Sequence, residues 1–231
     1  HRRADDARTL IISTARELFL TKGYDNTSVD AINAKASLSK GTFYHYFKTK
    51  SDLLDAIVEE LTNEGWQHTK TAIEDKSGGS IARFIRFLAA ARRWRIVALP
   101  QNAAILRAAL SLENALLRER MRARSISLAE PALAELIADG NHEGVFQVSK
   151  PSSTARVFLI IAYGVSDDMV REVASSTLPD EELLESLVAR GRAFMRSIEG
   201  LLGVPPRSLG EPETELLAQM VRAFRSKGVS P

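Results

Sequence analysis

The spacing of apolar residues constrains this chain most, because it repeats every three to four residues along almost the whole length. The first segment shows the pattern with Ile11, Ile12, Ala15, Leu18 and Phe19. This spacing places apolar side chains on one face of an α-helix, whereas a half-buried strand would alternate apolar and polar residues. Segments with strand-like alternation are scarce. The sequence therefore predicts an all-α fold.

Glycine and polar residues divide the pattern into helices near the N-terminus. Gly23 is suited to end the first helix in a left-handed conformation, with Tyr24 packing back over the last turn. Thr27–Asp30 and Thr49–Asp52 have the spacing of capping boxes, which predicts the start of the second and fourth helices. Ser39 is expected to cap the third helix.

Longer helices are expected beyond residue 50, over about 50–75, 80–94, 102–139, 152–175, 180–202 and 212–225. Pro131 falls inside the third of these segments. Because proline lacks an N–H group and clashes with the preceding turn, we expect a boundary or kink near Leu128. Residues 1–50 are predicted to form one domain, and residues 51–231 a second, larger one.

The formal net charge of +2 is unevenly distributed. Residues 1–50 hold nine Lys or Arg against five Asp or Glu, a net charge of +4, so the rest of the chain carries −2. A basic end on an otherwise neutral chain favours a polyanionic partner there.

Several classes of site are not expected. The chain has no cysteine and four scattered histidines, so it offers no disulfide and no recognisable metal-binding spacing. No phosphate-binding glycine loop or nucleophile elbow is present. We therefore expect no enzyme activity, no cofactor and no metal. No apolar run approaches the roughly 18 residues of a membrane span, and no signal peptide is recognisable, so a cytoplasmic protein without a membrane partner is expected.

The second and third helices are short and are joined by the three residues Ser37–Ser39. This is the spacing of a helix-turn-helix, in which the second helix enters the major groove of DNA. Phe43 and Phe47 lie four residues apart and are assigned to the core, together with Val29, Ile32 and Leu38. The opposite face then presents Lys40, Thr42, Tyr44 and His45.

These exposed side chains are of the types that bind DNA. Lysine and threonine can reach base edges, while tyrosine and lysine can bind phosphates. Gly41 would allow the backbone to approach closely, and Lys50 at the start of the fourth helix would add a phosphate site. The alternative is an aromatic-rich core helix. However, five aromatic rings in the nine residues 39–47 cannot all face inward on two turns.

Residues 8–54 resemble the DNA-binding domain of the tetracycline-repressor-like (TetR) transcriptional regulators. The matching stretches are Ile12–Phe19, Gly23–Tyr24, Thr27–Ile32 and Ser39–Leu54. The resemblance implies an all-α homodimer whose remaining helices sense a ligand and dimerise. It places the DNA contacts on Thr27, Lys40, Gly41, Thr42, Tyr44, His45 and Lys50, and we group Ser39 with them. One departure is Ser37, where the family commonly has glycine.

The helices at 152–175 and 180–202 look like the pair that forms the intersubunit bundle of the family; ordinary packing within one chain is the alternative. The candidates to line a ligand pocket are Trp66, Phe84, Phe87, Trp94, Leu106, Leu110, Asn114 and Tyr163. For each of them taken singly, plain core is the favoured alternative. The basic cluster Arg92–Arg95 could attract an anionic ligand or simply be a solvated helix end.

The function that the sequence favours is a ligand-responsive repressor, which binds a palindromic operator as a homodimer and is released by a small molecule. Two other classes compete with it. An enzyme lacks support from any motif. An architectural DNA-binding protein without a sensor would not need some 150 further residues of apolar-rich helix.

Overall fold

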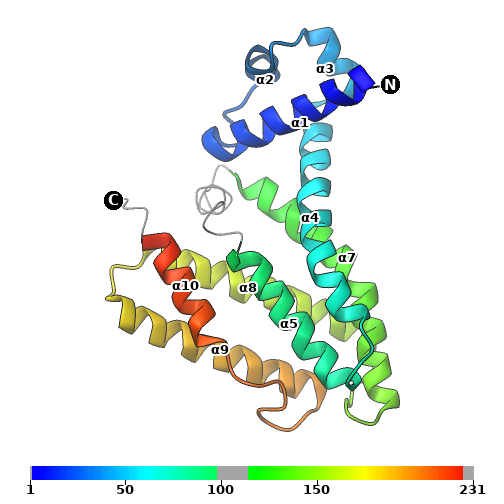
Figure 1. The fold of residues 1–231 in the computed structure, drawn as a ribbon, viewed down its shortest axis with the longest axis vertical. Coiled ribbons are helices and arrows are strands. Elements are labelled where there is room, and N and C mark those ends of the chain that lie inside the picture. Colours follow the sequence, from blue (N-terminus) through cyan, green and yellow to red (C-terminus); the bar gives the residue numbers. More distant parts are fainter. Residues whose placement is uncertain (1, 98–113, 226–231) are drawn as a thin grey trace. The chain divides into compact units, whose positions relative to one another are not determined.

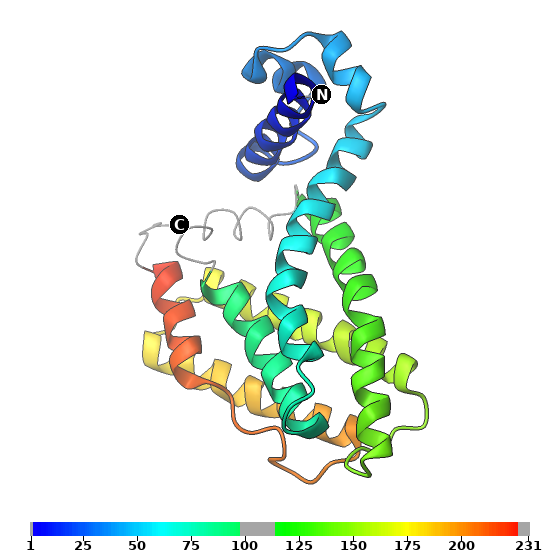
Figure 2. The same cartoon turned by 45° about the vertical axis from the view of Figure 1, so that its right-hand side comes forward.

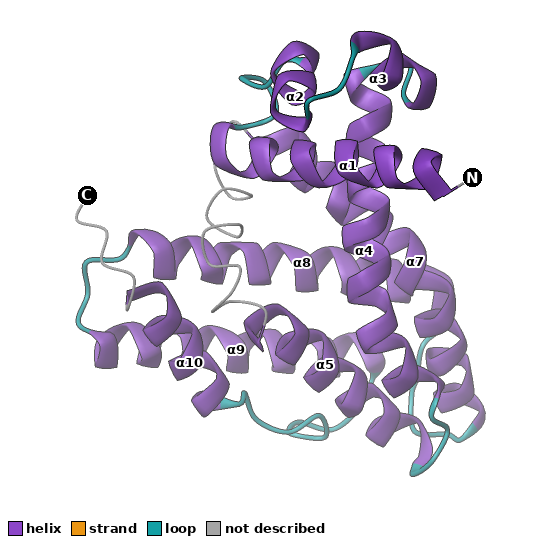
Figure 3. Cartoon of the chain, turned by 45° about the horizontal axis from the view of Figure 1, so that its top comes forward, coloured by secondary structure: helices purple, strands orange, loops and turns teal. Residues whose placement is uncertain are grey.

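The computed structural model describes residues 2–97 and 114–225, and these ranges contain helices and loops but no strand (Figure 3). The all-α prediction is confirmed. The helices are α1 (Arg2–Lys22), α2 (Val29–Ala36), α3 (Lys40–Tyr46), α4 (Lys50–Glu74), α5 (Gly79–Val97), α7 (Ala115–His142), α8 (Pro151–Ser175), α9 (Asp180–Leu202) and α10 (Thr214–Arg225).

The chain divides into two compact units. The N-terminal unit comprises His1–Glu64 and Ala104–Arg124, and the C-terminal unit comprises Gly65–Ala103 and Ser125–Pro231. The helices α4 and α7 each contribute residues to both units.

The N-terminal unit is held together by one apolar core. Phe19 of α1, Ile32 of α2, Phe43 of α3 and Leu53 of α4 are fully buried in it. Leu117 of α7 joins the same core and is 1% exposed. Each such side chain contributes roughly 1.5–3 kcal/mol when it is fully buried. The first turns of α7 therefore belong to this unit, although some ninety residues separate them from α1 along the chain.

The C-terminal unit is built from longer helices. α8 and α9 lie side by side, and α10 packs across them at an angle (Figures 1 and 2). Phe84 of α5, Leu133 of α7, Phe158 of α8 and Ile198 of α9 meet in its core. The Phe84 and Phe158 rings pack edge to face with their centres 5.2 Å apart.

A buried arginine joins three helices of the C-terminal unit by hydrogen bonds. Arg83 of α5 is 3% exposed, and its Nε and Nη2 donate to the carbonyl of Ile73 at 3.2 and 3.0 Å. Its Nη1 donates to Oδ2 of Asp139 at 2.6 Å. The Ile73 carbonyl lies in the last turn of α4, where helix carbonyls lack a partner within the helix. Arg83 therefore ties the end of α4 to both α5 and α7.

Of the two alternatives expected near Leu128, the helix boundary is wrong, and the kink stays a prediction. α7 is one continuous helix from Ala115 to His142, with Pro131 inside it. The proline removes one N–H group, which would have bonded the carbonyl of Ser127. Leu133, Leu136 and Ile137 are completely buried on the following turns, so packing of this face outweighs that loss.

In the part of the chain that the structure describes, no helix is both long and apolar enough to cross a membrane.

Candidate nucleic-acid interface

The turn between α2 and α3 has the predicted three residues. Ser37 adopts a left-handed conformation with φ 55° and ψ 40°, and its N–H donates to the Ala34 carbonyl at 3.3 Å. The N–H of Leu38 donates to the Asn33 carbonyl at 2.9 Å. These bonds satisfy carbonyls at the end of α2 and turn the chain sharply into α3.

Side-chain caps begin the helices of this region. The Oγ of Ser39 accepts from the N–H of Thr42 at 3.1 Å and lies 2.9 Å from the Thr42 hydroxyl. Thr49 and Asp52 exchange two hydrogen bonds at the start of α4, at 3.0 and 3.1 Å, which confirms that capping box. At α2 the cap is Ser28 rather than Thr27, since the Ser28 Oγ accepts from the N–H of Ala31.

The two faces of α3 differ as predicted. Phe43 is completely buried and Phe47 is 5% exposed, and both lie in the core with Ile32. On the opposite face, Tyr44 is 55% exposed. Lys40, Gly41 and His45 are also exposed, and Thr42 is half-buried.

Lys40 already has a partner on this surface. Its Nζ lies 2.9 Å from Oδ1 of Asp30, in the first turn of α2. The hydrogen bond to Asp30 raises the pKa of the Lys40 ammonium, so this lysine remains charged over the range in which proteins work.

Two other predicted contacts hold the turn between α1 and α2. The Thr27 side chain is buried, and its hydroxyl donates to the Gly23 carbonyl at 2.8 Å. The Nζ of Lys50 donates to the carbonyls of Tyr24 and Thr27 at 2.9 and 3.1 Å and lies 4.2 Å from the centre of the Tyr24 ring. In this structure both side chains fix the loop that precedes α2.

Asn114 serves the N-terminal unit rather than the group of ligand candidates in the C-terminal unit. Its side chain is 1% exposed, accepts from the N–H of Tyr24 at 3.1 Å and donates to the Phe19 carbonyl at 3.0 Å. Nearby, Arg120 of α7 donates to Oδ1 of Asp55 and to the hydroxyl of Ser51, both on α4. No sequence pattern signals these contacts, because they join distant parts of the chain.

Four ligand candidates gather in one cluster of the C-terminal unit. Phe84 and Phe87 are buried in it, and Trp66 and Tyr163 pack against it half-buried. Trp94 stacks on His68 instead, with ring centres 4.0 Å apart. Leu106 and Leu110 lie outside the described residues.

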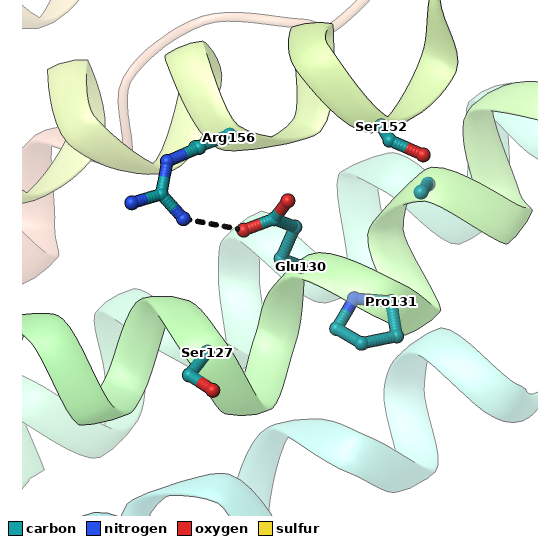
Figure 4. A pocket seen from close by; sticks show the side chains of 6 residues that line it. Ser127, Glu130, Pro131, Ser152 and Arg156 are labelled. Carbon is teal, nitrogen blue, oxygen red and sulfur yellow. Dashed lines mark hydrogen bonds and ion pairs between the residues drawn. The ribbon is translucent and has the colours of Figure 1, made fainter.

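A shallow cavity of about 330 Å³ lies elsewhere, between α7 and α8. It is lined by Ser127, Glu130, Pro131, Ala134, Ser152 and Arg156 (Figure 4). Arg156 and Glu130 form an ion pair at 2.9 Å. None of the predicted ligand residues that the structure describes lines this cavity. Among the described residues, no cluster of three or more His, Asp or Glu side chains could hold a metal ion.

Comparison with known proteins agrees with the helix-turn-helix. The family described as bacterial regulatory proteins, tetR family, matches residues 11–57. The Transposon Tn10 TetC protein of Escherichia coli is 46% identical over 50 residues, which are 22% of this chain and 25% of that protein. The HTH-type transcriptional regulator UidR of Escherichia coli is 25% identical over 183 residues, covering 74% of this chain and 88% of UidR. Residues 11–57 are thus a DNA-binding region of the TetR type.

The similarity to TetR-family proteins extends over both units. A TetR-family transcriptional regulator from Pectobacterium atrosepticum is 25% identical in sequence, with a TM-score of 0.55. The match covers 90% of this chain and 99% of that one. The chain is therefore a DNA-binding transcriptional regulator with an N-terminal helix-turn-helix and a C-terminal helical domain.

Proposed function

We propose that this regulator is a repressor that binds a palindromic operator as a homodimer and leaves it when a small molecule binds. The observation that carries the proposal is the exposed face of α3, on which hydrogen-bonding and basic side chains surround Tyr44 while the apolar side chains point inward. The proposed DNA-binding set is Thr27, Ser39, Lys40, Gly41, Thr42, Tyr44, His45 and Lys50.

The members of this set have different roles. Lys40, Tyr44 and His45 are exposed and can reach the groove. A Cβ at Gly41 would meet only Ser39 Oγ, at an ordinary 3.7 Å, so packing inside the protein does not require glycine there. Close approach of DNA is the reason that we propose for it. Thr27 and Ser39 act indirectly, through the turn and the cap that they stabilise.

Dimerisation is proposed through α8 and α9. On α8 the apolar residues Val157 and Ile160 are 43% and 50% exposed, and a Cβ added at Gly164, one turn later, would meet no neighbour within 4 Å. Positions three and four apart share one helix face. This stripe would bury itself against a second copy of the same surface, which is how a two-fold interface is built.

Effector binding is proposed for the C-terminal unit, at the cluster of Trp66, Phe84, Phe87 and Tyr163, with Trp94, Leu106 and Leu110 as further candidates. Ligand sites are mostly lined by apolar and aromatic side chains. The proposal involves no catalysis, cofactor or metal, and action on promoter DNA would put the protein in the cytoplasm. Residues 1–50 would carry DNA binding, and residues 51–231 sensing and dimerisation.

The test is selection of bound DNA from a random pool, with the oligomeric state measured in parallel by light scattering. We expect a near-palindrome whose half-site centres are separated by about 34–36 Å or a multiple of it. A selected site without an inverted repeat, or a monomer bound to a single site, would contradict the proposal. Addition of an effector should then release the selected DNA.

A further inference from the structure

An acidic side chain stands on the surface that is offered to DNA. Asp30 of α2 and Lys40 of α3 are 65% and 67% exposed, and their charged atoms lie 2.9 Å apart. Exposed ion pairs add little stability, typically about 0–1 kcal/mol. The pair therefore matters for where it lies rather than for stability. It places a carboxylate, which phosphates repel, beside the first residue of the recognition helix.

The pair leaves donors and acceptors free. A lysine ammonium has three N–H donors and a carboxylate accepts only. One N–H of Lys40 is used by Oδ1 of Asp30, which leaves two donors on Nζ. Because each carboxylate oxygen has two lone pairs, Oδ1 can accept a second hydrogen bond, and Oδ2 can accept as well. The surface thus presents two donors beside one accepting carboxylate.

This arrangement matches the major-groove edge of one base pair. Guanine presents the acceptors N7 and O6, and the cytosine N4 amino group donates beside them. O6 and N4 are joined by the base-pair hydrogen bond, so they lie about 2.9 Å apart. The Lys40 Nζ and Asp30 Oδ1 atoms have the same separation.

We infer that Asp30 and Lys40 together recognise a G·C base pair in each half-site. Lys40 donates to O6 and N7 of guanine, and Asp30 accepts from N4 of cytosine. The inference rests on the operator binding proposed above and assigns Asp30 as a further residue that determines specificity.

An A·T pair fits less well. Its donor, adenine N6, lies between the acceptors N7 and thymine O4. If the Asp30 carboxylate accepted from adenine N6, the Lys40 ammonium could donate to N7 or to thymine O4 but not to both. Guanine offers the ammonium N7 and O6 side by side. An acidic residue that only repelled phosphates would instead weaken binding to every sequence alike.

The experiment compares operators selected by the wild type, Lys40→Ala, Asp30→Asn and Asp25→Asn. The base pair recognised by Lys40 is the one at which Lys40→Ala loses preference. We expect the wild type to select G·C there, and to bind a site with A·T at that position about 5- to 150-fold more weakly, the range for a good bidentate contact. Asp30→Asn should reduce this difference in affinity between the G·C and A·T sites. In a variant that already carries Lys40→Ala, Asp30→Asn should not change the base preference further.

Asp25→Asn is the matched control, because it removes an exposed acid from the same domain without touching Lys40. It should alter affinity for all sequences but leave base preference intact. If Asp30→Asn did the same, or if the wild type selected A·T at the Lys40 position, the inference would be overturned. Selection of no preferred sequence by the wild type would overturn it together with the proposed operator binding, whereas an operator insensitive to Asp30 would overturn the inference alone.

Discussion

Asn33 of α2 occupies an unfavourable position in the core of the N-terminal unit. It is 5% exposed, and neither its amide nitrogen nor its amide oxygen has a hydrogen-bond partner in the protein. An unsatisfied buried polar group costs about 1–3 kcal/mol. We therefore predict that Asn33→Ala raises the free energy of unfolding by about 1 kcal/mol, after allowance for lost packing. Asn63→Ala on α4 is the control for helix propensity, and urea denaturation is the measurement. A destabilised Asn33→Ala variant would show that the amide is satisfied in solution.

Asp139 makes stability depend on pH. Its hydrogen bond from Arg83 holds the pKa of the Asp139 carboxyl below its ordinary value. A carboxyl whose pKa is depressed by folding stabilises the protein above the unfolded-state pKa of about 4, and this contribution is lost as the pH falls through the lower folded-state value. The stability difference between wild type and Asp139→Asn should thus be largest near pH 7 and shrink below about pH 4. Denaturation across that range measures it, and a constant difference would count against the Arg83 contact.

Residues with local partners could be predicted from the sequence, and residues with distant partners could not. Ser39 and Thr42, or Thr49 and Asp52, lie three positions apart, so their hydrogen bonds follow from helix geometry alone. Asn114 forms hydrogen bonds with residues 90 and 95 positions away in the chain, and no sequence periodicity predicts such contacts. The sequence alone therefore places Asn114 among the ligand candidates instead.

At the scale of the element, α2 and α3 illustrate the same rule. Their lengths, their turn and the inward face of Phe43 all follow from spacing and caps within residues 28–47. Pro131 of α7 shows the opposite case, because the local preference for a break is opposed by the buried residues that follow it. Local signals thus define the helix-turn-helix well, while the long helices depend on packing across the C-terminal unit.

The start of α4 links DNA binding to the loop before α2 through Lys50. Lys50→Ala removes the hydrogen bonds to the Tyr24 and Thr27 carbonyls, so we predict a loss of about 1.5–3 kcal/mol in stability. Binding to all DNA sequences should weaken, with the salt slope reduced by about one unit if the ammonium also meets a phosphate. The control is Lys48→Ala, since Lys48 is exposed and should leave stability unchanged. Altered base preference with an unchanged salt slope would contradict this assignment.

At the scale of the whole molecule, effector and operator must be linked reciprocally if the proposed function holds. A ligand shifts an equilibrium only by its differential affinity for two conformations, and couplings of about 1–3 kcal/mol, or 5- to 150-fold, are typical. α4 is a continuous helix that begins at Lys50 in the N-terminal unit and contains Trp66 in the C-terminal unit. These residues are about 24 Å apart along the helix, at about 1.5 Å per residue. We therefore expect α4 to carry the coupling.

Softening α4 between those points should reduce the coupling. Buried positions such as Ile57, which is 1% exposed, are unsuitable for this test because their substitution would disrupt the core. Glu60 and Glu64 are exposed, so a Glu60→Gly/Glu64→Gly variant weakens the helix at a cost of about 1 kcal/mol per glycine, and the corresponding double alanine variant keeps the helix intact. With an effector identified by its shift of the melting temperature, operator affinity is measured with and without it. We expect the effector to change affinity less in the glycine variant than in the alanine variant. Equal coupling in two variants that fold and bind both partners would show that α4 does not carry the signal.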